Sequence, residues 1–115
     1  MSKELEDRFK KFARDVRDFC QKVRWDIINR EYIGQLIRSS GSVGANYMEA
    51  SDSLGKADEL MKLKISRREA KESIHWLSLI LVYENGQLEN DRKYLIAEAE
   101  QIKKILSAII LKLRS

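Results

Sequence analysis

Apolar residues recur at alternating steps of three and four along most of this chain of 115 residues, and no proline interrupts them. Positions three and four apart share one face of an α-helix, whereas a half-buried β-strand shows alternation at every second residue. The second pattern does not occur in the sequence. The periodicity therefore predicts an all-α protein built from long amphipathic helices.

The pattern divides into four helices, which we expect over residues 3–28, 31–54, 56–84 and 91–114. The stripe of the first helix consists of large apolar side chains: Leu5, Phe9, Phe12, Val16, Phe19, Val23 and Ile27. Asn29 either ends this helix or caps the second. Gly55 is suited to ending the second helix, Asn85-Gly86 to a turn, and Asn90 to the N-cap of the fourth.

The second helix contains three glycines, Gly34, Gly41 and Gly44, each of which costs about 1 kcal/mol relative to alanine in a helix interior. Two interpretations remain open from the sequence. Either the small residues allow a neighbouring helix to approach closely, or residues 39–44 form a loop.

Four helices with short connections pack as antiparallel neighbours, so we expect one domain over residues 1–115, an antiparallel up-and-down four-helix bundle. The third helix carries a second apolar stripe, about 100° from the first. Its members are Met61, Ile65, Trp76, Leu79 and Tyr83. Because one internal seam does not need both stripes, the sequence predicts a homo-oligomer.

The overall composition favours a cytoplasmic protein that does not enter a membrane. No apolar run reaches the roughly 20 residues of a membrane span, and the charged N-terminal residues do not resemble a signal peptide. A single cysteine cannot form an internal disulfide. The net charge of +4 permits binding to nucleic acid without requiring it.

Two features raise the question of catalysis, and both have simpler explanations. Glu72 and His75 have the spacing of a carboxylate–histidine metal motif, but His75 is the only histidine, so one chain cannot complete such a site. Cys20 lies beside the first apolar stripe with no histidine near it in sequence, which favours a buried structural residue. We therefore expect no catalytic residue, no metal and no cofactor.

A polar stripe runs along the second helix at steps of three and four. It consists of Gln35, Arg38, Ser42, Asn46 and Glu49. One interpretation is a solvated face. The other is a half-buried structural network in which Arg38, Asn46 and Glu49 form hydrogen bonds across helices.

The third helix contains the most basic stretch of the chain, with several acidic residues nearby. The candidate nucleic-acid-binding residues are Lys62, Lys64, Arg67, Arg68 and Lys71. An ordinary solvated face is the alternative. Arg14, Arg17 and Arg24 on the first helix form a second basic group.

The run from Gln35 to Ala50 resembles the signature of the bacterial four helix bundle proteins, a family that includes the proteins encoded in intervening sequences of 23S ribosomal RNA genes. The matching positions are Gln35, Leu36, Arg38, Ser39, Ser42, Ala45, Asn46 and Glu49. Residues 64–73, with Trp76 and Leu77, resemble the third helix of one branch. Departures occur at Ala50, at Gly55 and in the absence of a proline between the first two helices.

The resemblance implies a left-handed bundle and a homo-oligomer, with a pentameric ring the favoured form. It also relates the chain to accessory proteins of diversity-generating retroelements, which bind nucleic acid, and it supplies no catalytic residue. The first functional hypothesis is thus a non-enzymatic oligomeric binding or scaffold protein, with RNA or DNA as a partner. The alternative is a structural module that binds a protein partner and has no role with nucleic acid. A metal-dependent enzyme is the least favoured class.

Overall fold

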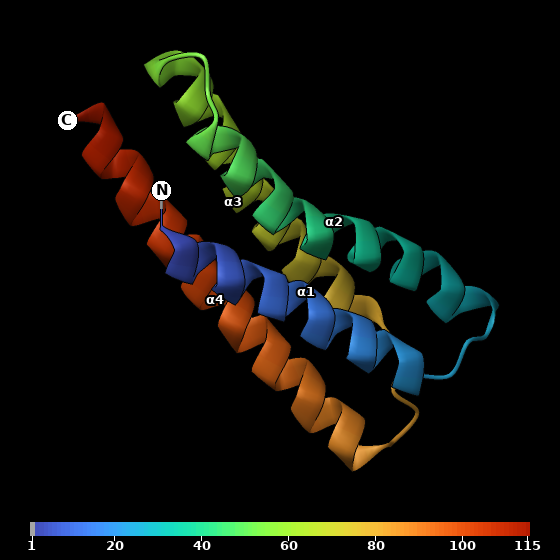
Figure 1. Ribbon diagram of the computed structural model, residues 1–115. Helices are drawn as coiled ribbons and strands as arrows, with labels where there is room; N and C mark the ends of the chain where they lie inside the picture. Colours follow the sequence, from blue (N-terminus) through green and yellow to red (C-terminus); the bar gives the residue numbers. More distant parts are fainter. Residues whose placement is uncertain (1) are drawn as a thin grey trace.

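The computed structural model describes residues 2–115, which form four α-helices in an up-and-down bundle (Figure 1). The helices are α1 (Lys3–Lys22), α2 (Ile27–Ser51), α3 (Lys56–Leu79) and α4 (Gly86–Arg114). Each helix packs against its neighbours in the order α1–α2–α3–α4 and back to α1, while α1 and α3, like α2 and α4, lie on diagonals. The all-α fold class predicted from the periodicity is therefore confirmed.

The predicted apolar stripes meet along the axis of the bundle. Phe9, Phe12 and Val16 of α1 are fully buried, as are Ala99, Ile102 and Leu106 of α4. The Phe9 ring packs edge-on against Tyr47 of α2, with ring centroids 5.0 Å apart. The Tyr47 hydroxyl oxygen accepts a hydrogen bond of 2.9 Å from the backbone N–H of Ser2, which fastens the start of α1 to α2.

Small residues bring α2 and α3 close together. The hydroxyl oxygens of Ser39 and Ser73 lie 2.9 Å apart, and the Ser66 hydroxyl donates to the backbone carbonyl of Val43 at 2.7 Å. A side chain as short as serine reaches a main-chain atom of another helix only where the two backbones approach closely. α2 runs without a break through Ser39–Gly44, so the loop interpretation of residues 39–44 was wrong.

The first two helices end and begin earlier than the sequence predicted. α1 stops at Lys22 rather than residue 28, because Val23 is extended and the Trp25 indole N–H donates to the Cys20 carbonyl at 2.8 Å. Asp26 caps α2 by accepting from the N–H of Asn29. Ile27 therefore belongs to α2, where it is 82% exposed, and not to the stripe of α1.

The connection between α3 and α4 also differs from the prediction. α3 ends at Leu79 rather than residue 84. The Arg92 guanidinium donates to the carbonyl of Leu77 in the last turn of α3 and to that of Ile80 directly after it. Tyr83 and Glu84 have positive φ values in the turn. Asn85, and not Asn90, caps α4 by accepting from the N–H of Leu88.

Asn29 ties these two connections together at one end of the bundle. Its amide nitrogen donates to the carbonyls of Arg24 and Leu81, and its amide oxygen accepts from the N–H of Leu81, each at 2.9 Å. The side chain is fully buried, and every polar atom of it is used. Asn29 thus neither ends α1 nor caps α2, as the sequence had suggested.

Several large apolar side chains remain exposed in a single chain. On α3 the second stripe separates, since Ile65 and Trp76 are partly buried while Met61 is 55% exposed. On α2, Ile37 and Met48 are exposed. Within residues 2–115, no helix has the length and apolar character that crossing a membrane requires.

Replacing Asn29 with alanine should lower the free energy of unfolding by about 3 kcal/mol, because buried backbone groups of two loops lose their partners. The measurement is urea denaturation followed by circular dichroism. Gln101→Ala, on the exposed side of α4, is the control and should change stability by less than about 0.5 kcal/mol. Equal stability of the Asn29 variant and the wild type would contradict the role assigned to this residue.

Candidate nucleic-acid interface

A hollow between α3 and α4 is lined entirely by cationic side chains. Its lining consists of Lys64, Arg67, Arg68 and Lys71 from α3 and Lys103 from α4, around a volume of about 410 Å³. The steps of three and four along α3 place its four cations on the side facing away from α2. Arg67 also donates to the Ser107 hydroxyl at 3.2 Å, which holds its guanidinium over the junction with α4.

Lys62 does not belong to this group, although the sequence placed it there. It lies on the side of α3 that faces α2, where its amino group is 3.4 Å from a carboxylate oxygen of Glu49. Because Ser66 and Ser73 face α2, residue 62, one helical turn before Ser66, turns toward the same neighbour. The structure thus brings together four of the five candidate residues and separates the fifth.

Lys103 is the member that sequence reasoning missed. It lies 32 to 39 residues along the chain from the α3 cations. The sequence could have predicted its position, because the short turn before α4 fixes the antiparallel register of α3 and α4. The contact between Arg67 and Ser107 shows that this register brings residue 103 close to Lys71.

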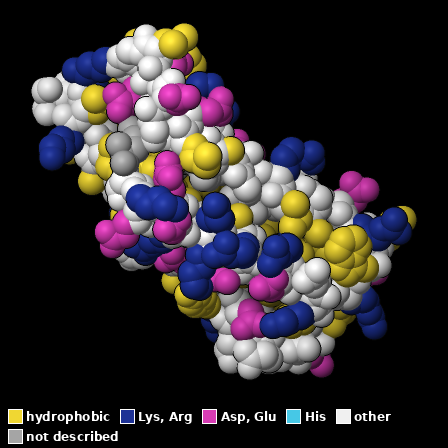
Figure 2. Space-filling model, in the orientation of Figure 1, with side chains coloured by type: hydrophobic (Ala, Val, Ile, Leu, Met, Phe, Trp, Pro, Cys, Tyr) yellow, Lys and Arg dark blue, Asp and Glu magenta, His cyan; other side chains and the backbone are white. Residues whose placement is uncertain are grey.

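The cationic character of the hollow is only partly neutralised at its rim. Glu72 lies 3.9 Å from Arg68, and Glu100 lies 3.6 Å from Lys103. Elsewhere positive and negative side chains are interspersed, as on the face with α1 in front (Figure 2). Lys10, Arg14 and Arg17 line a smaller hollow of about 280 Å³ between α1 and α2, together with small and apolar residues. The hollow between α3 and α4 differs in being lined by cations alone.

No aromatic side chain lines the hollow. Proteins that hold unpaired bases usually stack them on aromatic rings, whereas lysine and arginine contact phosphates whatever the base. The arrangement is therefore suited to a phosphate backbone and not to reading base identity.

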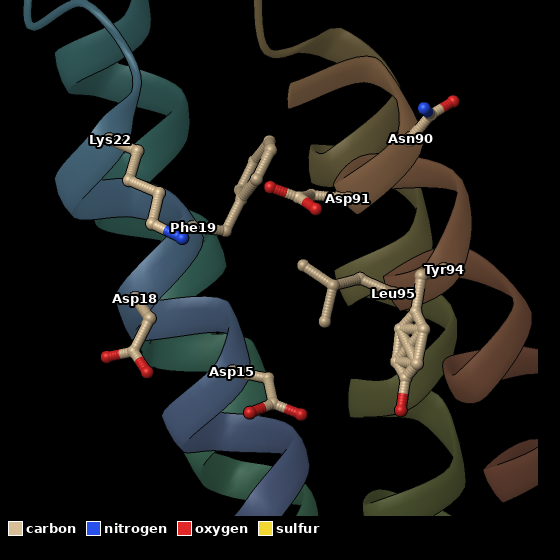
Figure 3. Close-up of a pocket in the computed structure, with 8 residues that line it drawn as sticks. All are labelled: Asp15, Asp18, Phe19, Lys22, Asn90, Asp91, Tyr94 and Leu95. Atoms are coloured by element: carbon tan, nitrogen blue, oxygen red, sulfur yellow. The ribbon is translucent and has the colours of Figure 1, made fainter. Parts of the chain in front are cut away.

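A second hollow, of about 350 Å³, lies between the end of α1 and the start of α4 (Figure 3). Phe19 and Leu95 point toward one another across it, and Asp15, Asp18 and Asp91 lie around them. The carboxylates already have partners: Lys11 pairs with Asp15, Arg17 with Asp18, and Gln87 donates to Asp91. Within residues 2–115, no group of three or more potential metal ligands is present.

Cys20 and His75, which raised the question of catalysis, lie in different environments. Cys20 is buried in the core, and burial raises the pKa of its thiol to about 12, so the nucleophilic thiolate is disfavoured. His75 is exposed on α3, and its ring packs edge-on against Trp76 with centroids 4.8 Å apart.

The polar stripe of α2 forms mainly local contacts within a single chain. The Ser42 hydroxyl donates to the Arg38 carbonyl, and the Asn46 amide donates to the Ser42 carbonyl, both at 2.9 Å. Gln35, Arg38 and Glu49 are exposed, and among the described residues the one polar contact of the stripe with another helix is the ion pair of Glu49 with Lys62. The buried polar contacts of α2 come instead from Asn29 and Ser39.

Comparison with known proteins identifies a family and a similar solved structure. A family described as 23S rRNA-intervening sequence protein matches residues 5–108. A solved structure from Bacteroides thetaiotaomicron, a protein of unknown function from the S23 ribosomal protein family, is similar, with 28% sequence identity and a TM-score of 0.75. This similarity covers 91% of the present chain and 96% of that chain. No curated protein matches the chain.

Replacing Glu49 with alanine should change the free energy of unfolding of one chain by no more than about 1 kcal/mol, because its ion pair with Lys62 is exposed. Thermal unfolding at low protein concentration is the measurement. A loss of about 3–5 kcal/mol, typical of a broken buried pair, would instead support the structural network.

The Cys20 thiol should not react with a thiol reagent at pH 8 while the protein is folded, and should react once urea unfolds it. Burial raises its folded pKa above the unfolded value of 9.0, so the thiol contributes stability below pH 9. That contribution should be lost as the pH rises from 9 toward 12. Rapid labelling of folded protein would contradict the burial of this residue.

Proposed function

The chain belongs to the 23S rRNA-intervening sequence protein family. We propose that it is a non-enzymatic, homo-oligomeric helical-bundle protein that binds the phosphate backbone of RNA or DNA. The observation that carries this proposal is the hollow lined by Lys64, Arg67, Arg68, Lys71 and Lys103. The family name does not itself state a ligand, and the similar solved protein is of unknown function. The proposal therefore depends on the chemistry of this surface.

Phosphate contacts explain what such a surface does. Each lysine or arginine that neutralises a phosphate releases condensed counterions from the nucleic acid, so binding weakens as the salt concentration rises. The cations come from two helices held in register by the contact of Arg67 with Ser107, which keeps them together before any ligand arrives. Binding of this kind is tolerant of sequence, because phosphates are the same at every base.

Self-association is part of the same proposal. One chain presents only five cations in the hollow, which is a small number for a nucleic-acid interface. Several copies in one assembly would repeat the hollow and raise avidity without any new contact. Exposed apolar residues on α2 and α3, such as Met48 and Met61, supply surface that a second copy would cover.

The absence of a catalytic role is part of the proposal. A thiol whose pKa is raised by burial is a poor nucleophile. His75 is the single histidine of the chain, and it is exposed on α3. The basic hollow has no carboxylate in its lining that could act as a general base. Binding is therefore the function that these residues support best.

We expect the wild-type protein to bind duplex RNA and duplex DNA of arbitrary sequence at about 50 mM salt, with the logarithm of the affinity falling linearly with that of the salt concentration. The combined substitution Lys64→Gln, Arg68→Gln and Lys71→Gln should weaken binding to all sequences alike. It should also reduce the salt slope on duplex DNA by about 0.9 for each phosphate that the variant no longer neutralises. Fluorescence anisotropy over a series of salt concentrations measures both quantities.

The control removes the same number of charges elsewhere on the surface, by replacing the exposed residues Lys22 of α1, Arg30 of α2 and Lys93 of α4 with glutamine. This variant should retain most of the affinity. Equal reductions in affinity for the two triple variants would indicate a general charge effect and not a site between α3 and α4. No binding by the wild type at about 50 mM salt would end the proposal for nucleic acid and favour the module that binds a protein.

A further inference from the structure

A groove runs along the seam between α1 and α2, where these two helices lie side by side (Figure 1). Two hollows of about 280 Å³ each follow one another along it. They share Lys10 and Ala13 of α1 and Gly41 of α2, so they form one continuous depression, the α1–α2 groove. Every residue in the lining of either hollow belongs to α1 or α2, so neither α3 nor α4 contributes to the groove.

Small residues on both helices create the groove. Ala13 lines it from α1, and Gly41, Gly44 and Ala45 line it from α2. A Cβ atom added at Gly44 would lie 3.5 Å from the Cβ atom of Phe9, so α1 rests against α2 at that point. A Cβ atom added at Gly41 would meet no atom within 4 Å. The space beside Gly41 can therefore accept a side chain from another molecule.

The α2 side of the groove is apolar at both ends. Ile37 lines one hollow and Met48 the other, and these side chains are 42% and 53% exposed. The eleven residues between their positions correspond to about 16 Å along the helix axis, or about three turns. A groove of this length, with apolar ends and a floor of small residues, suits an amphipathic helix whose apolar residues recur every three or four positions.

The α1 side of the groove is cationic beside Ile37. Lys10, Arg14 and Arg17 line the hollow there, and no acidic residue does. Arg17 pairs with Asp18 at 3.2 Å. Lys10 and Arg14 form no ion pair within residues 2–115. Because they are four residues apart on one helix, they lie close together and would attract acidic residues with the same spacing.

The charges beside Met48 are more nearly balanced. Glu6 and Asp7 line the second hollow together with Lys3 and Lys10, and Asp7 pairs with Lys3 at 2.8 Å. The excess positive charge of the groove is therefore concentrated toward its other end, beside Ile37. A partner that complements the groove carries its acidic residues toward that end.

We propose that the α1–α2 groove is a docking site for an amphipathic helix of another protein. The apolar stripe of that helix lies over Gly41, and acidic residues beside the stripe pair with Lys10 and Arg14. A second copy of this chain is the less complementary occupant, because the chain itself has a net charge of +4. The inference goes beyond nucleic-acid binding, and self-association through exposed residues of α3 such as Met61 leaves the groove free.

The first test compares two synthetic helical peptides of about 16 residues that share a stripe of leucines at steps of three and four. One carries glutamates beside the stripe, and the other carries lysines at the same positions. The wild-type protein should bind the glutamate peptide about tenfold more tightly, because only that peptide pairs with Lys10 and Arg14. Fluorescence anisotropy of the labelled peptides measures both affinities.

The second test fills the groove. Gly41→Leu should abolish binding of the glutamate peptide, because Gly41 lines both hollows. Gly34→Leu is the matched control, since Gly34 is also an exposed glycine of α2 with no atom within 4 Å of an added Cβ, yet it lines neither hollow. This control should bind the peptide as the wild type does. Circular dichroism checks that both variants are folded.

The third test exchanges the charge of the groove. The double variant Lys10→Glu and Arg14→Glu should prefer the lysine peptide about tenfold, because the attraction is then reversed. The control variant, Lys22→Glu and Arg30→Glu, changes two exposed cations that do not line the groove and should keep the preference for glutamate. A loss of folding alone would weaken both peptides and would not exchange their order.

The outcomes distinguish this inference from the proposed function. Loss of peptide binding in Gly41→Leu but not in Gly34→Leu, together with the exchanged preference, would support the docking site. Equal binding of the two peptides by the wild type, or no binding at high micromolar concentration, would overturn it and leave nucleic-acid binding untouched. A change in the mass of the wild-type assembly caused by Gly41→Leu, measured by analytical ultracentrifugation, would also overturn it, because the groove would then be a contact between copies. Weaker binding of duplex RNA by the Lys10 and Arg14 variant, with no peptide bound by the wild type, would assign these cations to nucleic acid instead.

Discussion

The close contact of α2 with α3 is the constraint on which the other surfaces depend. Ser39 meets Ser73, and Ser66 reaches the main chain at Val43, so both helices are fixed in their rotation about their own axes. Once the serines of α3 face α2, its cations between residues 64 and 71 must point elsewhere, and they meet α4. The same seam turns the opposite side of α2, with Gly34 and Gly41, toward solvent. A larger residue at Ser66 or Ser73 would push the helices apart and shift both surfaces.

The periodicity of the sequence was sufficient to predict four helices and most of the core, because a helix must bury one face. Phe9, Phe12, Val16 and Phe19 of the first stripe are all buried, as their spacing predicted. The helix ends were not predictable in the same way, because several nearby polar residues can each form the hydrogen bond that caps a helix. Asn90 and Asn85 are equally good caps by composition, and Asn85 is used because the turn with positive φ at Tyr83 and Glu84 comes directly before it. Asn29 bonds with a loop 52 residues away, which no local pattern reveals.

The candidate interface was predictable in part, for a related reason. A run of basic residues on one helix is visible in the sequence, but its division between two faces depends on rotation, which separates Lys62 from Lys64. Lys103 required the register of α3 and α4.

The basic hollow and the exposed apolar residues of α2 lie on different sides of the bundle. The hollow lies between α3 and α4, and α4 occupies the diagonal position to α2 with no packing contact between them. A contact made through Met48 of α2 therefore leaves the hollow open. In the proposed assembly the hollow is repeated in a fixed relation, and a nucleic acid that reaches two copies of it is bound with an effective concentration set by their separation. A surface too small to bind well by itself thus becomes useful through repetition.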